Sequence, residues 1–238
     1  MKTVNIVHLY PKEMNIYGDN GNLLVLQKRL TWRGIPTEIY RIGIGDAIPE
    51  ETHLILGGGG QDKGQSAIAD DLKKKAGSLK TLAVQGVPML MICGMYQMLG
   101  HYFKTAEGEQ IPGIGLLDVY TVAGTDRIIG NCSVKTERFG TLIGYENHSG
   151  RTFLGAEVSA IGSTNVGQGN NSEDGLEGAV YNNVYGSYLH GPVLAKSPKF
   201  ADFLLEQALA CSGLGYTLER IDDTIEHSAA SVAIRRPR

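Results

Sequence analysis

Short apolar runs alternate with segments of helical spacing over about the first hundred residues of the chain. An apolar run bounded by glycine or polar residues indicates a strand, and apolar residues recurring every three or four positions indicate an amphipathic helix. The predicted strands are residues 3–9, 36–42, 53–56 and 88–92, and the predicted helices are residues 22–33, 66–75 and 79–85. The side chains expected to face the core from the first helix are Leu23, Leu26, Leu30 and Trp32. This alternation predicts a parallel sheet with helices on both faces.

The pattern changes between about residues 103 and 184, where short strand-like runs are separated by Gly, Asn and Asp. The runs at 119–122, 131–136 and 181–184 predict further, partly antiparallel strands, and the polar stretch 167–175 predicts a loop. Ser197 followed by proline indicates the start of a last helix, which runs to about residue 210. We therefore predict one α/β domain over residues 1–212 and a polar C-terminal tail at 213–238.

The charge balance gives no support for a nucleic-acid or anionic-membrane partner. Lys and Arg number 22 against 25 Asp and Glu, which gives a formal net charge of −3. No apolar stretch is long enough to span a bilayer, and the first residues lack the pattern of a secretory signal. Three cysteines at unrelated spacings predict neither a disulfide framework nor a metal site. We expect a reduced, cytoplasmic protein that binds no metal and does not insert into a membrane.

A cysteine lies where the fourth predicted strand ends. The apolar run 87–92 breaks at Cys93-Gly94, and a helical pattern follows at once. A nucleophile on such a sharp strand-to-helix turn is held up at the end of a sheet, as serine is in the nucleophile elbow of hydrolases. The N-terminus of the following helix can stabilise a thiolate there. Cys93 is therefore a candidate nucleophile, although a plain buried cysteine fits the same pattern.

Four consecutive glycines follow the third predicted strand, at residues 57–60. The spacing from Gly59 to Gly64 is that of a phosphate loop, but Gln65 occupies the position of the lysine that reaches the phosphates. A dinucleotide fingerprint also fails, because position 48 is not glycine. Nucleotide binding is therefore disfavoured on this chain. Backbone N–H groups of glycines at a strand end can instead stabilise an oxyanion.

A thiol nucleophile needs a base, and two of the histidines lie between glycines. His148 belongs to the segment 144–150 and His190 to the segment 186–192. Flanking glycines let a histidine reach into a cleft, although they are also ordinary turn chemistry. Spacing alone does not choose between the two.

Three motifs occur in a fixed order: CGMYQMLG at 93–100, GYENHSG at 144–150 and YLHG at 188–191. Together they resemble the glutamine amidotransferase domain of the cobyric-acid-synthase type (CobB/CobQ-like), a branch of the class I glutaminases. The segments YGDNGN at 17–22 and GGGQD at 58–62 bring the chain closer to the small glutaminase subunits of lipid II isoglutaminyl synthases. The resemblance implies a flavodoxin-like three-layer sandwich.

The resemblance also implies roles for individual residues. Cys93 is expected to be the nucleophile and His190 the base, while Arg127 holds the α-carboxylate of glutamine through its planar fork of donors. His148 is expected to support the loop beneath the site. The remaining expected site residues are Gln97 for substrate binding and the backbone N–H groups of Gly58, Gly59, Gly94 and Met95 for the oxyanion.

The chain departs from the class I pattern at two places. Class I glutaminases usually carry a glutamate two residues after the catalytic histidine, where this chain has Pro192. The candidates for the third catalytic group are therefore Asp19 and Glu13 in the first loop. Met91 and Met95 stand where relatives carry glycines on either side of the cysteine.

The implied reaction is hydrolysis of L-glutamine through a cysteine thioester, followed by delivery of ammonia to a synthetase. By resemblance, the partner is a Mur-ligase-like subunit (MurT type) that forms a heterodimer with this chain and binds ATP and magnesium. That partner would amidate the D-glutamate α-carboxyl of lipid II in peptidoglycan synthesis, and no cofactor is expected on this chain. The rival interpretations are a cobyrinate-type glutaminase component, a class I-like cysteine peptidase and a flavodoxin-like binding or redox module.

Overall fold

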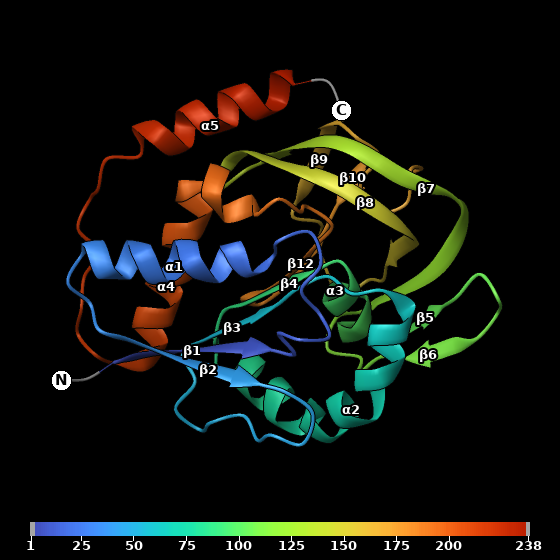
Figure 1. Ribbon diagram of the computed structural model, residues 1–238, viewed down its shortest axis with the longest axis horizontal. Helices are drawn as coiled ribbons and strands as arrows, with labels where there is room; N and C mark the ends of the chain where they lie inside the picture. Colours follow the sequence, from blue (N-terminus) through green and yellow to red (C-terminus); the bar gives the residue numbers. More distant parts are fainter. Residues whose placement is uncertain (1–2, 237–238) are drawn as a thin grey trace.

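A six-stranded sheet forms the centre of the protein in the computed structural model, which describes residues 3–236 (Figure 1). The strand order is β11-β12-β4-β3-β1-β2. These strands are β1 (Val4–Leu9), β2 (Thr37–Ile42), β3 (Leu54–Gly57), β4 (Met89–Ile92), β11 (Ala179–Tyr181) and β12 (Val184–Ser187). Every neighbouring pair is parallel except β11 and β12. The carboxyl ends of the parallel strands therefore meet at one edge, where open α/β sheets bind their ligands.

Helices cover both faces of this sheet. Figure 1 shows α1 (Asn20–Trp32) and α4 (Pro198–Ser212) on one side and α2 (Asp62–Val84) on the other, while α3 (Gly94–Leu99) is a short helix after β4. The predicted α/β class with a mostly parallel sheet is thus confirmed. One continuous helix replaces the two predicted at 66–75 and 79–85, because Gly77 between them lowers helix propensity without ending the helix.

The buried face of α1 is nearly as predicted. Leu23, Leu26 and Leu30 are buried, but the Trp32 side chain is 56% exposed. The prediction for Trp32 was wrong because it lies two positions past Leu30, which at 3.6 residues per turn is the opposite side of the helix.

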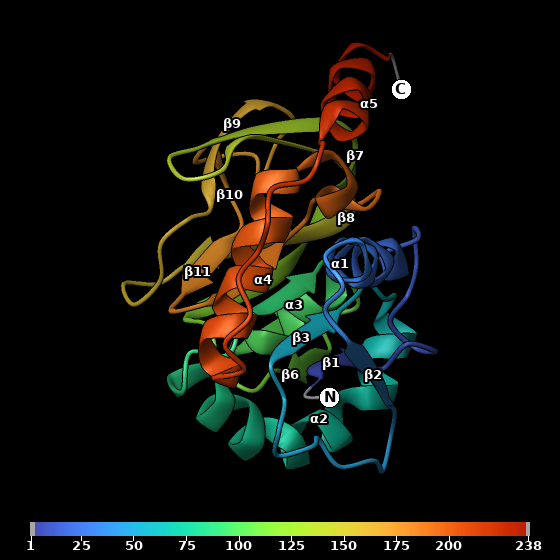
Figure 2. The same cartoon turned by 90° about the vertical axis from the view of Figure 1, so that its left-hand side faces the viewer.

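Most strands of the second half form a separate sheet, whereas β11 and β12 extend the central one. Its order is β10-β9-β7-β5-β6, and β8 pairs with β7. These strands are β5 (Tyr102–Lys104), β6 (Gln110–Pro112), β7 (Val119–Thr136), β8 (Gly140–Leu154), β9 (Gly162–Val166) and β10 (Leu176–Glu177). Figure 2 shows this sheet beyond the edge of the central one.

The local predictions for this half were confirmed only in part. The predicted strands 119–122 and 131–136 are the two ends of the single strand β7, and residues 181–184 span the turn between β11 and β12. The segment 144–150, whose glycines are ordinary in turns, lies inside β8. Its glycines serve close approach, because a Cβ on Gly144 would lie 2.7 Å from Cβ of Leu189 and one on Gly150 would lie 2.3 Å from Nε2 of Gln97.

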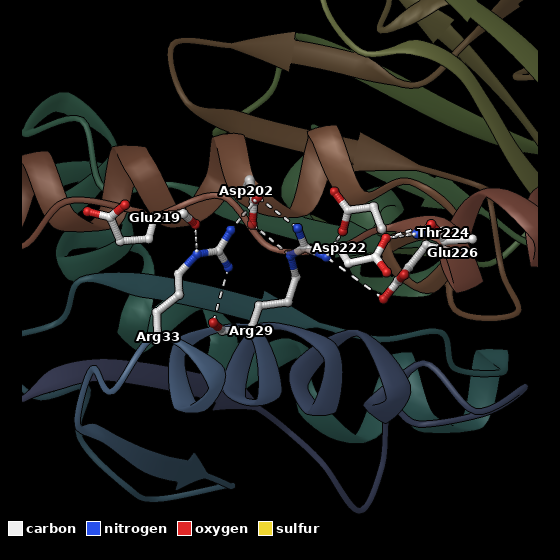
Figure 3. A network of polar contacts seen from close by, with 8 residues as sticks. Arg29, Arg33, Asp202, Glu219, Asp222, Thr224 and Glu226 are labelled. Carbon is white, nitrogen blue, oxygen red and sulfur yellow. Dashed lines mark hydrogen bonds and ion pairs between the residues drawn. The ribbon is translucent and has the colours of Figure 1, made fainter.

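The chain beyond α4 is not only a polar tail, because it contains α5 (Thr224–Arg235). A short 3-10 helix, η1 (Val193–Lys196), leads into α4. Figure 3 shows the polar network that holds the chain beyond α4 against α1. The Arg29 side chain, 1% exposed on α1, donates to both carboxylate oxygens of Asp202 at 2.6 and 2.7 Å and to Asp223 at 2.7 Å. Arg33 adds bonds to Asp202 and to the Glu219 carbonyl. A buried guanidinium needs such partners, so α1, α4 and the start of α5 are held together.

Within residues 3–236, none of the helices combines the length and the apolar character that crossing a bilayer requires.

Candidate active site

Cys93 occupies a strained position at the end of β4. Its φ and ψ are 50° and −107°, outside the usual regions for a residue with a side chain, and its N–H donates to the Ser187 carbonyl of β12 at 2.8 Å. Gly94 follows because space is lacking: a Cβ there would lie 2.9 Å from the backbone nitrogen of Gly60. The turn therefore has the geometry of a nucleophile elbow, with a buried cysteine at its apex.

His190 lies just beyond β12, with its side chain 0% exposed. Its Nδ1 donates to the carboxylate of Asp19, at 3.0 Å from Oδ1 and 3.1 Å from Oδ2. Asp19 is buried at the start of α1, and the Gly59 N–H donates to its Oδ2 at 2.7 Å. The ring of Tyr17 meets His190 edge-on, with centroids 4.9 Å apart. The imidazole is therefore fixed on two sides by the loop that follows β1.

The electrostatic environment of His190 favours its protonated form. Burial lowers the pKa of His190, but the neighbouring Cys93 sulfur and the Asp19 carboxylate outweigh burial and raise the pKa to about 10. Nε2 of His190 is buried and makes no hydrogen bond of good geometry within residues 3–236. The Cys93 sulfur is close enough to the imidazole to raise the pKa of His190. The structure thus brings Cys93, His190 and Asp19 into one chain of contacts.

A cavity of about 350 Å³ opens beside the cysteine. Cys93, Gln97, Arg127 and His148 all contribute to its wall. This volume lies in the range typical of small-molecule sites.

Arg127 lies where the pairing of β7 with β8 is irregular. The regular register stops at Ala123 and resumes at Ile128, and such bulges redirect side chains. The guanidinium donates from Nε to Oδ1 of Asn147 at 2.6 Å and from Nη2 to the hydroxyl of Tyr17 at 3.0 Å. These bonds leave Nη1 without a hydrogen bond to any described residue. A planar cation held in this way can pair with a carboxylate in the cavity.

Comparison with known proteins places the chain in a family. Residues 5–198 match the CobB/CobQ-like glutamine amidotransferase domain. The chain belongs to this family.

Two relatives resemble this amidotransferase over most of their length. It is 37% identical over 237 residues to the lipid II isoglutaminyl synthase (glutamine-hydrolyzing) subunit GatD of Staphylococcus aureus, covering 99% of this chain and 97% of the relative. This chain is also 41% identical over 209 residues to the subunit of the same name from Streptococcus pneumoniae, and the match covers 87% of this chain and 80% of the relative. A probable cobyric acid synthase of Methanoregula boonei is 36% identical over 146 residues, which cover 56% of this chain and 28% of that protein.

Solved structures share the fold of this amidotransferase. The structure of PurLQS from Thermotoga maritima superposes with a TM-score of 0.61 at 18% identity, covering 88% of this chain and 99% of that chain. At this identity the similarity concerns the fold alone.

The backbone donors expected for the oxyanion are only partly available in this amidotransferase. The N–H of Gly59 is taken by Asp19, and the N–H of Met95 donates to the carbonyl of Gly58 at 3.3 Å. Gly94 is the first residue of α3, so its N–H has no acceptor within the helix. Gly60, which was not among the expected donors, lines the cavity, whereas Gly58, Gly59, Gly94 and Met95 do not.

Met91 and Met95 do not obstruct the cavity. Both side chains are buried and neither lines the cavity. A Cβ on Gly57 would lie 2.8 Å from Sδ of Met91 and 2.8 Å from Cγ of Met95. Gly57 therefore leaves the space that the side chains of Met91 and Met95 occupy near the cysteine.

Gln97 lines the cavity as part of a hydrogen-bond network. Its Oε1 accepts from Nε2 of Gln65 at 2.8 Å, and its Nε2 donates to the hydroxyl of Tyr188 at 3.0 Å. The Tyr188 hydroxyl also bonds to Thr152 at 2.6 Å. Both ends of the Gln97 amide therefore have protein partners.

Glu13, the other candidate for the third catalytic group, makes no hydrogen bond to His190.

Sequence reasoning gave no site role to Tyr17 and only a supporting one to His148. Tyr17 contacts both His190 and Arg127, and His148 lines the cavity. The motif YGDNGN contained the signal for Tyr17, because it placed an aromatic residue two positions before Asp19. No local pattern showed that His148 faces the same cavity as the cysteine, since this depends on the pairing of β8 with β7.

Proposed function

We propose that this chain hydrolyses L-glutamine to glutamate and ammonia. The observation that carries the proposal is the contact chain Cys93–His190–Asp19 beside a cavity that also holds the Arg127 guanidinium. A cysteine next to a protonated imidazole is a strong nucleophile, and a buried carboxylate at the other ring nitrogen fixes the tautomer. A guanidinium in the same cavity selects a substrate that carries a carboxylate.

The reaction proceeds in two halves. The Cys93 sulfur attacks the side-chain carbonyl carbon of glutamine, and the oxygen becomes an oxyanion. His190 donates its proton to the leaving nitrogen, so ammonia departs and a glutamyl thioester remains. His190 then accepts a proton from water, the hydroxide attacks the thioester, and glutamate leaves with the sulfur restored. Asp19 keeps Nδ1 of His190 protonated throughout, so that Nε2 performs both transfers.

Backbone N–H groups would stabilise the oxyanion. We assign this role to Gly94 and Gly60, because Asp19 engages the N–H of Gly59 and the Gly58 carbonyl engages that of Met95. Gly60 lies against Gly94 and lines the cavity. Loss of one such donor typically costs about 3 kcal/mol of transition-state stabilisation.

The physiological role that we propose is that of a glutaminase subunit in lipid II amidation. Two relatives covered over 97% and 80% of their length carry the name of such a subunit. Ammonia is mostly ammonium at neutral pH, so a glutaminase is useful when a synthetase receives the ammonia directly. We propose that this synthetase is a separate Mur-ligase-like subunit of the cytoplasm that binds ATP and magnesium and amidates the D-glutamate α-carboxyl of lipid II.

The test is release of glutamate from glutamine by the full chain, measured alone and after co-purification with a Mur-ligase-like synthetase from the same genome. The Cys93→Ala variant is expected to lose at least about a thousandfold in rate. Equal rates in the two proteins would contradict the assigned nucleophile. Glutamine-dependent amidation of cobyrinate instead of lipid II would favour the cobyrinate-type alternative, and peptide cleavage that does not need Arg127 would favour a peptidase.

A further inference from the structure

His148 lies in the wall of the cavity, and one nitrogen of its ring has no partner among residues 3–236. The side chain is 3% exposed and lines the cavity together with Cys93 and Arg127. Its Nε2 is buried and has no hydrogen-bond partner among residues 3–236. Buried polar atoms are almost always paired, so an exception beside a reactive cysteine needs an explanation.

The hydrogen bond at the other nitrogen determines what Nε2 can do. Nδ1 lies 2.8 Å from the carbonyl oxygen of Gly150. A carbonyl oxygen only accepts, so Nδ1 carries the hydrogen. Burial, with smaller contributions from nearby cationic groups including Arg151 and His190, lowers the pKa of His148 to about 3. The ring is therefore neutral at pH 7, and Nε2 is an acceptor.

Packing prevents the ring from turning toward a partner elsewhere. It stacks on Tyr188 at 3.7 Å with an interplanar angle of 9°, and the Tyr188 hydroxyl is itself held by Gln97 and Thr152. Gly150 therefore occupies one edge of the His148 ring and Tyr188 one face. The edge that remains carries Nε2.

We propose that Nε2 of His148 accepts a hydrogen bond from an N–H group of bound glutamine. This inference rests on the proposed function. Glutamine offers two nitrogen donors, the side-chain carboxamide and the α-ammonium, and both present hydrogens to a lone pair. A side-chain carboxylate presents only oxygen lone pairs, so contact with the carboxamide would also distinguish glutamine from glutamate. His148 thereby becomes a residue of substrate recognition.

The experiment measures ligand binding in a protein that cannot turn over. Three full-length proteins are compared: Cys93→Ala, Cys93→Ala with His148→Phe, and Cys93→Ala with His148→Gln. Phenylalanine keeps a flat ring on Tyr188 without an acceptor, and glutamine restores an amide oxygen. The dissociation constants of glutamine, glutamate and 4-carbamoylbutanoate, which lacks the α-ammonium, are measured by calorimetry.

His148→Phe is expected to weaken glutamine binding about tenfold, and His148→Gln is expected to recover part of the loss. If the donor is the carboxamide, His148→Phe weakens the binding of 4-carbamoylbutanoate as much as that of glutamine, and the binding of glutamate is unchanged. If the donor is the α-ammonium, His148→Phe weakens the binding of glutamate, and the binding of 4-carbamoylbutanoate is unchanged. Unchanged glutamine binding, or equal weakening of all three ligands, would overturn the inference. Failure of the Cys93→Ala protein itself to bind glutamine would overturn the proposed function as well.

Discussion

The two sheets contribute different kinds of residue to the cavity. The central sheet supplies the reacting groups from the carboxyl ends of its strands: Cys93 follows β4, His190 follows β12, and Asp19 lies in the loop after β1. The second sheet supplies Arg127 from β7 and His148 from β8, which we assign to substrate binding.

This difference follows from what each sheet can fix. The strands β1, β3, β4 and β12 are buried along their whole length, so their ends are held by packing on both faces. Groups that exchange a proton need such precise placement. The β7–β8 ribbon is less buried and has a bulge before Ile128, so it can present long side chains over the cavity. Changes at the central sheet should therefore lower kcat, and changes at the ribbon should raise KM.

Asp19→Asn should give the largest effect among the changes that keep the cysteine. The amide accepts less well from Nδ1 and can hold the wrong tautomer of His190, so kcat should fall about a thousandfold or more. The measurement is steady-state glutamine hydrolysis, with Glu13→Gln as the matched control that should stay near wild type. A large loss in the control with a small loss in Asp19→Asn would reverse the assignment of the third group.

Arg127→Ala should mainly raise KM, by about 30- to 100-fold, because a charge-assisted pair with the α-carboxylate is lost. Arg127→Lys keeps the charge without the planar fork and should fall between wild type and Arg127→Ala. KM comes from initial rates over a range of glutamine concentrations. An unchanged KM with a reduced kcat would mean that Arg127 acts on the reacting groups instead.

The position of Cys93 could be predicted because its signals are contiguous. An apolar run, a Cys-Gly pair and a helical pattern lie within one segment, and the structure has β4, the turn and α3 there. The sequence reduced the partner of His190 to two residues of one loop but did not choose between them. That choice depends on packing, since a Cβ on Gly58 would lie 2.4 Å from the carbonyl oxygen of Met14. The loop after β1 can therefore bring Asp19 to His190 only because the residues beneath it, 57–60, are glycines without side chains.

The second sheet was harder to predict because its information is not local. Glycines at 144 and 150 are typical of a turn, yet they lie in β8, where they admit Leu189 and Gln97 from distant parts of the chain. The pairing of Ile128 with His148 brings the neighbouring Arg127 to Asn147 of the segment 144–150, and no spacing rule connects these two parts of the sequence. The fold class could therefore be predicted from alternation, whereas the placement of Arg127 and His148 in one cavity wall could not.

Glu177 joins the two sheets and should make the stability of the protein depend on pH. It ends β10, and its carboxylate accepts from the Ser187 hydroxyl at 2.6 Å and the Tyr188 N–H at 3.1 Å, just before His190. Burial raises the pKa of Glu177 to about 7. An acid with a raised pKa in the folded state stabilises the protein fully below its unfolded pKa, and this contribution is lost as the pH rises through about 7.

The free energy of unfolding in urea, measured from pH 5 to pH 8, tests this role of Glu177. Wild type should lose about 2–3 kcal/mol more stability over this range than Glu177→Gln, which cannot ionise. The exposed Glu173→Gln serves as the control and should follow the wild-type curve. Parallel curves for wild type and Glu177→Gln would show that Glu177 is ionised throughout.

Tyr17→Phe should give the smallest effect, and it tests where one half of the site ends and the other begins. Tyr17 belongs to the loop after β1, yet its hydroxyl accepts from Arg127 and its ring edge packs on His190. Phenylalanine keeps the ring and removes only the acceptor. Asn147 still holds Nε of Arg127 at 2.6 Å, and Tyr17 is 41% exposed, so water can replace the hydroxyl. The expected result is a two- to fivefold increase in KM with kcat unchanged, in line with the net worth of one exposed hydrogen bond. A lower kcat at unchanged KM would mean that the hydroxyl orders His190 and not Arg127, and Tyr17 would then belong with the reacting groups of the central sheet.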